Sequence, residues 1–200
     1  MPLPPSVARE ALHTRQIAMH GYRREDGLYD IEAHMVDTKA RALAVDGARA
    51  VAAGEPIHDM HVRLVVDQDL RIVDVAACTD AAPYPVCPEA ARSLQGLKGV
   101  RIAAGWSRSI RELLTGRKGC THLTELLQPM ATVAYQTLFD VRQARPTAVD
   151  ANGKPRMIDS CHAYAGDGDV VRQRWPLHVD ASAVQQAATS TRLSLSKGTP

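Results

Sequence analysis

The chain has 200 residues, of which 45% are hydrophobic, and a formal net charge of +2. This length and apolar content predict one domain with a buried core. The 24 basic and 22 acidic residues are interspersed, and one Phe and two Trp offer few rings for base stacking, which argues against nucleic-acid binding. No apolar run reaches the roughly 18 residues of a membrane helix, and the first residues do not resemble a signal peptide. We therefore expect a cytoplasmic protein that binds no membrane.

The predicted domain organisation follows from composition along the chain. Residues 1–11 are rich in proline and are expected to form a flexible arm. Residues 12–178 carry the regular patterns and are expected to form a single α+β domain. Residues 179–200 consist largely of Ala, Ser, Thr and Gln, and are expected to be disordered.

Two antiparallel hairpins are predicted in the N-terminal half. Alternating segments at 13–20 and 28–35 flank an Asp26-Gly27 turn, and a stronger pair at 60–66 and 70–75 flanks a short polar turn. In the segment 28–35 the apolar side chains share one face, so Glu32 and His34 share the other. That polar face is expected to meet either solvent or a pocket.

Three helices are predicted in the C-terminal half. One begins at Cys87-Pro88, one covers 106–114, and the third begins after Gly119-Cys120. Pro129 lies inside the third and is expected to kink it or divide it in two. The fold class is therefore α+β, with an antiparallel sheet of about four strands packed by about three helices.

Cys120 is the first candidate for a functional residue. Free amide groups at a helix start favour negative charge, so this position predicts a lowered thiol pKa and a metal ligand or nucleophile. His122 lies two residues further on. The alternative is that Cys120 is a small buried apolar residue and His122 a surface residue.

A metal site would have to be assembled from distant segments, because the chain contains neither a CxxC pair nor an HExxH motif. The candidate ligands are Cys120, His122, Cys87 and the pair His58-Asp59. Thiolate, imidazole and carboxylate together suit zinc or iron. We therefore predict a metal-binding protein with Cys120 as its anchor.

Two other functions are compatible with the same residues. In one, Cys120 and His122 line the pocket of a metal-free enzyme or small-molecule-binding protein. In the other, the chain is an interaction module whose cysteines are structural. The partner would accordingly be a small molecule or another protein, and a further pair, Cys161-His162, has no predicted role.

Seven short motifs resemble those of a bacterial family known only as a domain of unknown function, DUF2889. They include Gly119-Cys120-Thr121-His122-Leu123 and Asp159-Ser160-Cys161-His162-Ala163, and the others lie at 13–15, 21–32, 37–39, 58–60 and 79–84. The resemblance covers residues 12–175. It implies a common fold and a set of shared residues, and it implies no reaction.

The order of elements is also similar to that of the U-type iron–sulfur cluster scaffold proteins. Those proteins bind zinc or a cluster through three cysteines and an aspartate. The similarity implies Asp59, Cys87 and Cys120 as ligands, with His122 as a nearby substitute. Where the scaffold has Cys-Gly-Asp, this chain has Ile57-His58-Asp59.

Overall fold

The computed structural model describes residues 3–44 and 46–179. They belong to two compact units, one ending at Arg142 and one beginning at Gln143. The limits predicted for the domain, at residues 12 and 178, stay predictions. The part of the predicted tail beyond residue 179 lies outside the described residues.

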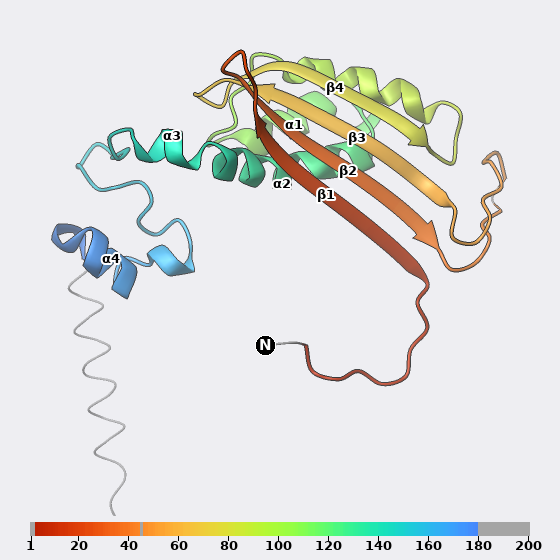
Figure 1. Cartoon of the computed structure of the whole chain (residues 1–200), viewed down its shortest axis with the longest axis horizontal. Helices are drawn as coiled ribbons and strands as arrows, with labels where there is room; N and C mark the ends of the chain where they lie inside the picture. Colours follow the sequence, from red (N-terminus) through yellow and green to blue (C-terminus); the bar gives the residue numbers. More distant parts are fainter. Residues whose placement is uncertain (1–2, 45, 180–200) are drawn as a thin grey trace, which may run out of the picture. The chain divides into compact units, whose positions relative to one another are not determined.

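A four-stranded antiparallel sheet forms the centre of the first unit (Figure 1). Each strand pairs with its neighbour in the chain, which short connections permit only between antiparallel strands. The predicted hairpins and the α+β class are thereby confirmed. The strands are β1 (His13–Arg23), β2 (Tyr29–Lys39), β3 (Pro56–Val66) and β4 (Ile72–Ala81).

Burial alternates strictly along β2, because successive side chains point to opposite faces of the sheet. The predicted apolar face is buried, with Ile31 and Met35 at 0% exposure. The same face continues to Asp37, which is 1% exposed. Among the described residues, Asp37 is the one polar or charged residue classed as buried.

Helices cover this face of the sheet (Figure 1). The 3₁₀ helix η1 (Cys87–Leu97) packs on β4, and α1 (Trp106–Leu114) packs on η1 and on α2 (Thr121–Thr137). The short elements η2 (Gly116–Lys118) and α3 (Phe139–Gln143) precede and follow α2. All three predicted helix positions are confirmed, although the first is a 3₁₀ helix.

Helix α2 lies against β1, β2 and β3. It runs unbroken past Pro129 to Thr137, so of the two predicted effects of Pro129, a kink or a division, the division does not occur. Pro129 is exposed, and the backbone hydrogen bond that it removes therefore falls on the side facing water. The apolar stripe on the other side holds the helix to the sheet; its buried members are Leu123, Leu126, Leu127, Met130 and Ala134.

The second unit contains three short helical elements and few buried side chains. The elements are η3 (His162–Tyr164), α4 (Asp169–Arg174) and η4 (Pro176–His178). Pro155, Ile158 and Val171 are its buried apolar residues within the described range. No helix among the described residues combines the length and the apolar character needed to cross a bilayer.

Candidate metal centre

The start of α2 holds the cysteine and histidine that the sequence singles out. Cys120 is the residue that precedes the first helical turn, and its Sγ lies 3.8 Å from Nδ1 of His122. Burial opposes ionisation of the thiol, but His122 and the backbone N–H groups of His122 and Leu123 outweigh it and lower the Cys120 pKa. The direction agrees with the prediction, although the His122 side chain lowers the pKa more than the N–H groups of the helix start do.

His58 of β3 meets His122 at this point. The two ring centroids are 3.8 Å apart and the ring planes are inclined by 35°. The His58 side chain is only 13% exposed. The fold thus brings together imidazoles from a strand and from a helix start that are far apart in the chain.

Asp37 of β2 lies behind His58. The Nδ1 of His58 donates a hydrogen bond to Oδ2 of Asp37 (3.0 Å), which leaves Nε2 of His58 as the free ring nitrogen. One ligand atom from each of Asp37, His58 and His122 lies within 4.8 Å of the others. These three side chains, together with Cys120, are called the helix-start cluster below.

Arg15 of β1 holds the carboxylate of Asp37 from the other side. Its Nε and Nη2 each donate to one carboxylate oxygen at 2.8 Å, and its Nη1 donates to Glu125 of α2 at 2.7 Å. Burial raises the pKa of the Asp37 carboxyl, but the hydrogen bonds from Arg15 and His58 lower it below its ordinary value. Asp37 is therefore a fixed anion that links β1, β2 and β3.

A cavity of about 420 Å³ opens beside the helix-start cluster. Asp37, His58 and His122 line it, together with the basic side chains of Arg15 and Lys39. A ligand in this cavity could reach both histidines.

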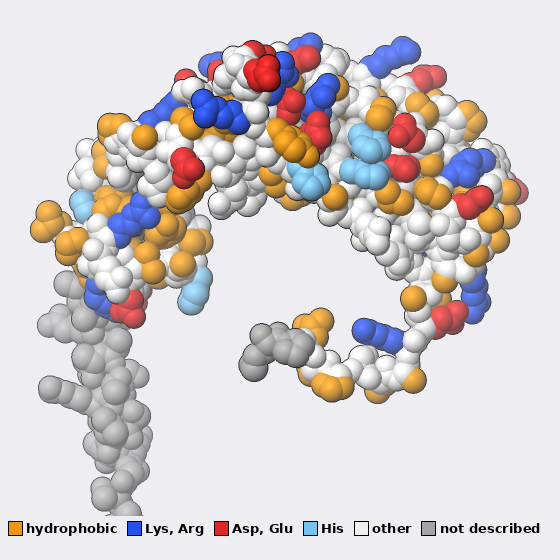
Figure 2. All heavy atoms as spheres, viewed as in Figure 1, with side chains coloured by type: hydrophobic (Ala, Val, Ile, Leu, Met, Phe, Trp, Pro, Cys, Tyr) orange, Lys and Arg blue, Asp and Glu red, His pale blue; other side chains and the backbone are white. Residues whose placement is uncertain are grey.

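Asp59 follows His58 in β3 and contributes to a different group of side chains. Its Oδ1 lies 2.7 Å from Nε2 of His34 and 3.4 Å from Nε2 of His61. Since neighbouring residues of a strand face opposite ways, Asp59 lies on the face away from the helices, here called the open face. Figure 2 shows histidine side chains gathered beside acidic ones on the visible surface of the molecule.

The ligands predicted from the sequence therefore do not form one site in the folded chain. Cys120, His122 and His58 lie together, whereas Asp59 lies on the open face with His34 and His61. Cys87 is half-buried at the first residue of η1 and belongs to neither histidine group found among the described residues. Cys161 and His162 lie in the second unit, where Cys161 is exposed.

Asp37 is the main residue of the site that the sequence prediction missed. The signal was present, because Asp37 continues the alternation of Tyr29 to Met35 and so falls on the buried face. A carboxylate on a buried face requires a partner.

The contact between His34 and His61 could not be predicted in the same way. It depends on the register between β2 and β3, which no local pattern in the sequence gives.

The fold and this cluster define an α+β protein with paired histidines held by a buried carboxylate. Residues 13–136 match the family described as Protein of unknown function (DUF2889), and the chain belongs to that family. The comparisons find no matching curated protein and no matching solved structure. The resemblance to iron–sulfur scaffold proteins thus receives no support from them.

Gly119 positions the start of α2 and gives a first test of this geometry. A Cβ at Gly119 would lie 2.6 Å from the carbonyl oxygen of Leu114, which is backbone and cannot rotate away. We expect Gly119→Ala to lose about 2 kcal/mol of unfolding free energy in urea denaturation. In the control Gly96→Ala, the nearest atom is a Leu113 methyl group at 4.0 Å, and we expect little change. Equal stability of the two variants would contradict the close approach.

Proposed function

We propose that the protein binds a zinc or iron ion at the helix-start cluster, through His58, His122 and Cys120. The observation that carries this proposal is the contact between His58 and His122, with the Asp37 carboxylate fixing the orientation of His58. Metal-binding histidines commonly donate their second ring N–H to a carboxylate in this way. Two imidazoles and a thiolate suit zinc and iron.

Asp37 supports the metal indirectly in this proposal. Both of its oxygens already accept hydrogen bonds from Arg15, so the carboxylate has little capacity left for a metal bond. Its role is to keep the proton of His58 on Nδ1 and to direct Nε2 to the ion. Removal of such an outer partner typically weakens metal binding by about 10–100-fold.

The candidate ligand atoms lie slightly further apart than the ligands of a bound metal ion do, so they would move closer together on binding. Ligand atoms around a tetrahedral ion with bonds of about 2.1 Å lie about 3.4 Å apart. The Cys120 sulfur is 3.8 Å from Nδ1 of His122, close to this value. Three protein ligands would leave a fourth position open, as in catalytic zinc sites, and the cavity of about 420 Å³ offers space for a water or substrate there.

The test uses full-length protein without a histidine tag, stripped of metal and reloaded with Zn²⁺ or Co²⁺. We expect His122→Ala to lower the bound zinc by one equivalent per chain. Cys120→Ser should remove the thiolate-to-cobalt charge-transfer band while leaving the fold intact by circular dichroism. The matched control is His20→Ala, an exposed histidine of β1 outside the cluster. Unchanged zinc content in His122→Ala, with the charge-transfer band absent in the wild type, would contradict the proposal.

A metal-free enzyme or small-molecule-binding protein is the second candidate function. The lowered pKa of Cys120 and the cavity beside His122 favour it. In that case the purified protein would hold no zinc or iron at this cluster, and iodoacetamide would modify Cys120 faster than Cys87 at a pH below the ordinary thiol pKa.

All four cysteines are free, and we propose that the protein works in a reducing compartment such as the cytoplasm.

A further inference from the structure

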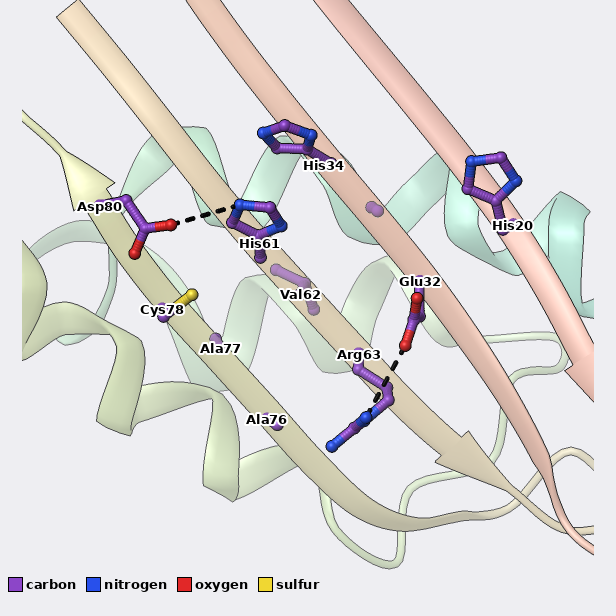
Figure 3. Close-up of a pocket in the computed structure, with 11 residues that line it drawn as sticks. His20, Glu32, His34, His61, Val62, Arg63, Ala76, Ala77, Cys78 and Asp80 are labelled. Atoms are coloured by element: carbon purple, nitrogen blue, oxygen red, sulfur yellow. Dashed lines mark ion pairs between the residues drawn. The ribbon is translucent and has the colours of Figure 1, made fainter. Parts of the chain in front are cut away.

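The open face of the sheet carries a second group of metal-ligating side chains. His34 comes from β2, Asp59 and His61 from β3, and Asp80 from β4. Figure 3 shows His34, His61 and Asp80 projecting from three adjacent strands, with the helices on the far side of the sheet. These four residues are called the open-face cluster below. None of them belongs to the helix-start cluster.

Strand register brings the two histidines into contact. His34 is directly paired with His61 across β2 and β3. Their rings stack with centroids 3.9 Å apart and planes inclined by 10°. Both Nε2 atoms are directed at the same oxygen of Asp59, at 2.7 and 3.4 Å.

A register shift brings the second carboxylate to the same place. Asp59 pairs with Ala81, whereas the next residue, Met60, pairs with Thr79, so Asp80 is an extra residue in β4. Such irregularities change the direction in which a side chain points. Here Oδ2 of Asp80 lies 3.4 Å from Nε2 of His61, on which two carboxylates now converge.

No lysine or arginine neutralises the carboxylates of this group within the described residues. The ion pairs of Asp59 are with His34 and His61, and that of Asp80 is with His61. Arg63, which lies two residues after His61 on the same face, pairs with Glu32 at 3.7 Å. A divalent ion would neutralise the two carboxylates and accept the lone pairs of both imidazoles.

Two of the three distances match the spacing between ligands of one metal ion, and the third is a hydrogen-bond distance that would widen on metal binding. Ligand atoms at about 2.1 Å from a metal are separated by about 3.4 Å in tetrahedral geometry and about 3.0 Å at a right angle. His61 Nε2 lies 3.4 Å from an oxygen of each aspartate, and His34 Nε2 lies 2.7 Å from Asp59. We propose that the open-face cluster binds a second divalent transition-metal ion through His34, His61 and Asp59, with the Asp80 carboxylate beside His61.

The surroundings leave room for an additional ligand of that ion. A shallow cavity of about 460 Å³ lies over the strands and is lined by His34, His61 and Asp80. Arg63 lines the same cavity and could contact a group bound to the metal. The site therefore resembles an open metal site more than a closed structural one.

The experiment titrates untagged, full-length protein with Zn²⁺ alone after removal of bound metal. The test variant is His34→Ala with His61→Ala, and the matched control is His20→Ala, a histidine of the same cavity outside the cluster. All three positions are at the sheet surface, so circular dichroism should show an intact fold. We expect the double variant to bind one zinc fewer per chain than the wild type and the control.

The outcome separates this site from the helix-start site. The Co²⁺ spectra are compared in a Cys78→Ser background, because Cys78 pairs with His61 across the strands and lines the same cavity. In that background the open-face cluster supplies only nitrogen and oxygen ligands, so the double variant should keep the thiolate charge-transfer band of Cys120. A zinc ion lost in the double variant but kept in His122→Ala supports the open-face site, whatever the fate of the first proposal. Zinc binding by the double variant equal to that of His20→Ala overturns it.

Discussion

Replacing Asp37 with Asn is expected to lower the free energy of unfolding by about 3 kcal/mol, the low end of the cost of breaking a buried ion pair. The carboxylate is 1% exposed and accepts hydrogen bonds from Arg15 and His58. Asn keeps the shape but presents an NH₂ group to these donors and leaves the guanidinium without its main counter-charge. The cost stays at the low end because Arg15 retains Glu125.

Urea denaturation of metal-free protein measures this loss, with Asp74→Asn as the matched control. Asp74 also forms an ion pair, to Lys98 at 2.6 Å, but both side chains are about half exposed. Exposed pairs contribute little, so we expect no measurable change in the control. If Asp37→Asn is as stable as the control, the carboxylate is not the link between strands that the geometry indicates.

The effect of Asp37→Asn should also depend on pH in a defined direction. The pKa of Asp37 is lowered from its ordinary value of 3.8, so its ionised form is the one that the fold stabilises. This contribution is complete above the unfolded pKa and is lost as the pH falls through the folded pKa. The stability difference between the wild type and Asp37→Asn should therefore be constant near neutrality and shrink below about pH 4.

Replacing Gly21 with Ala is expected to cost about 3 kcal/mol, the upper end of the cost of overpacking. A Cβ at this position of β1 would lie 1.7 Å from Oγ1 and 2.8 Å from Cβ of Thr137 in α2. Rotation of the threonine can move Oγ1 but not Cβ, so the helix end must lift from the sheet. The backbone at Gly21 itself suits alanine, because its φ is not positive.

A double-mutant cycle with Thr137→Ala identifies this contact as the cause. Thr137→Ala removes Oγ1 and Cγ2, so the Gly21→Ala/Thr137→Ala protein should recover part of the lost stability. Metal content should not change, because Thr137 ends α2 about 24 Å from its start. Additive losses in the cycle would show that helix and strand are not in close contact here.

Local patterns in the sequence predicted the elements of the fold. Alternation in β2 and β3 and the turn at Gly27 specified the hairpins, because strand periodicity and turn geometry act over a few residues. The lowered pKa of Cys120 was also predictable, since its causes, the His122 side chain and the backbone N–H groups of the helix start, are neighbours in the chain. The continuity of α2 past Pro129 was not, because packing on the sheet outweighs the local effect of one proline.

What the sequence by itself determined is the four-stranded α+β framework and the thiol at the start of α2. The tertiary structure decided which ligands meet: His58 and Asp59 are neighbours in the chain, yet one contacts His122 and the other contacts His34 on the opposite face. Strand geometry sends neighbouring side chains apart, while register and helix packing bring distant ones together. Those interactions are long-range, and so the two clusters could be assembled only from the folded chain.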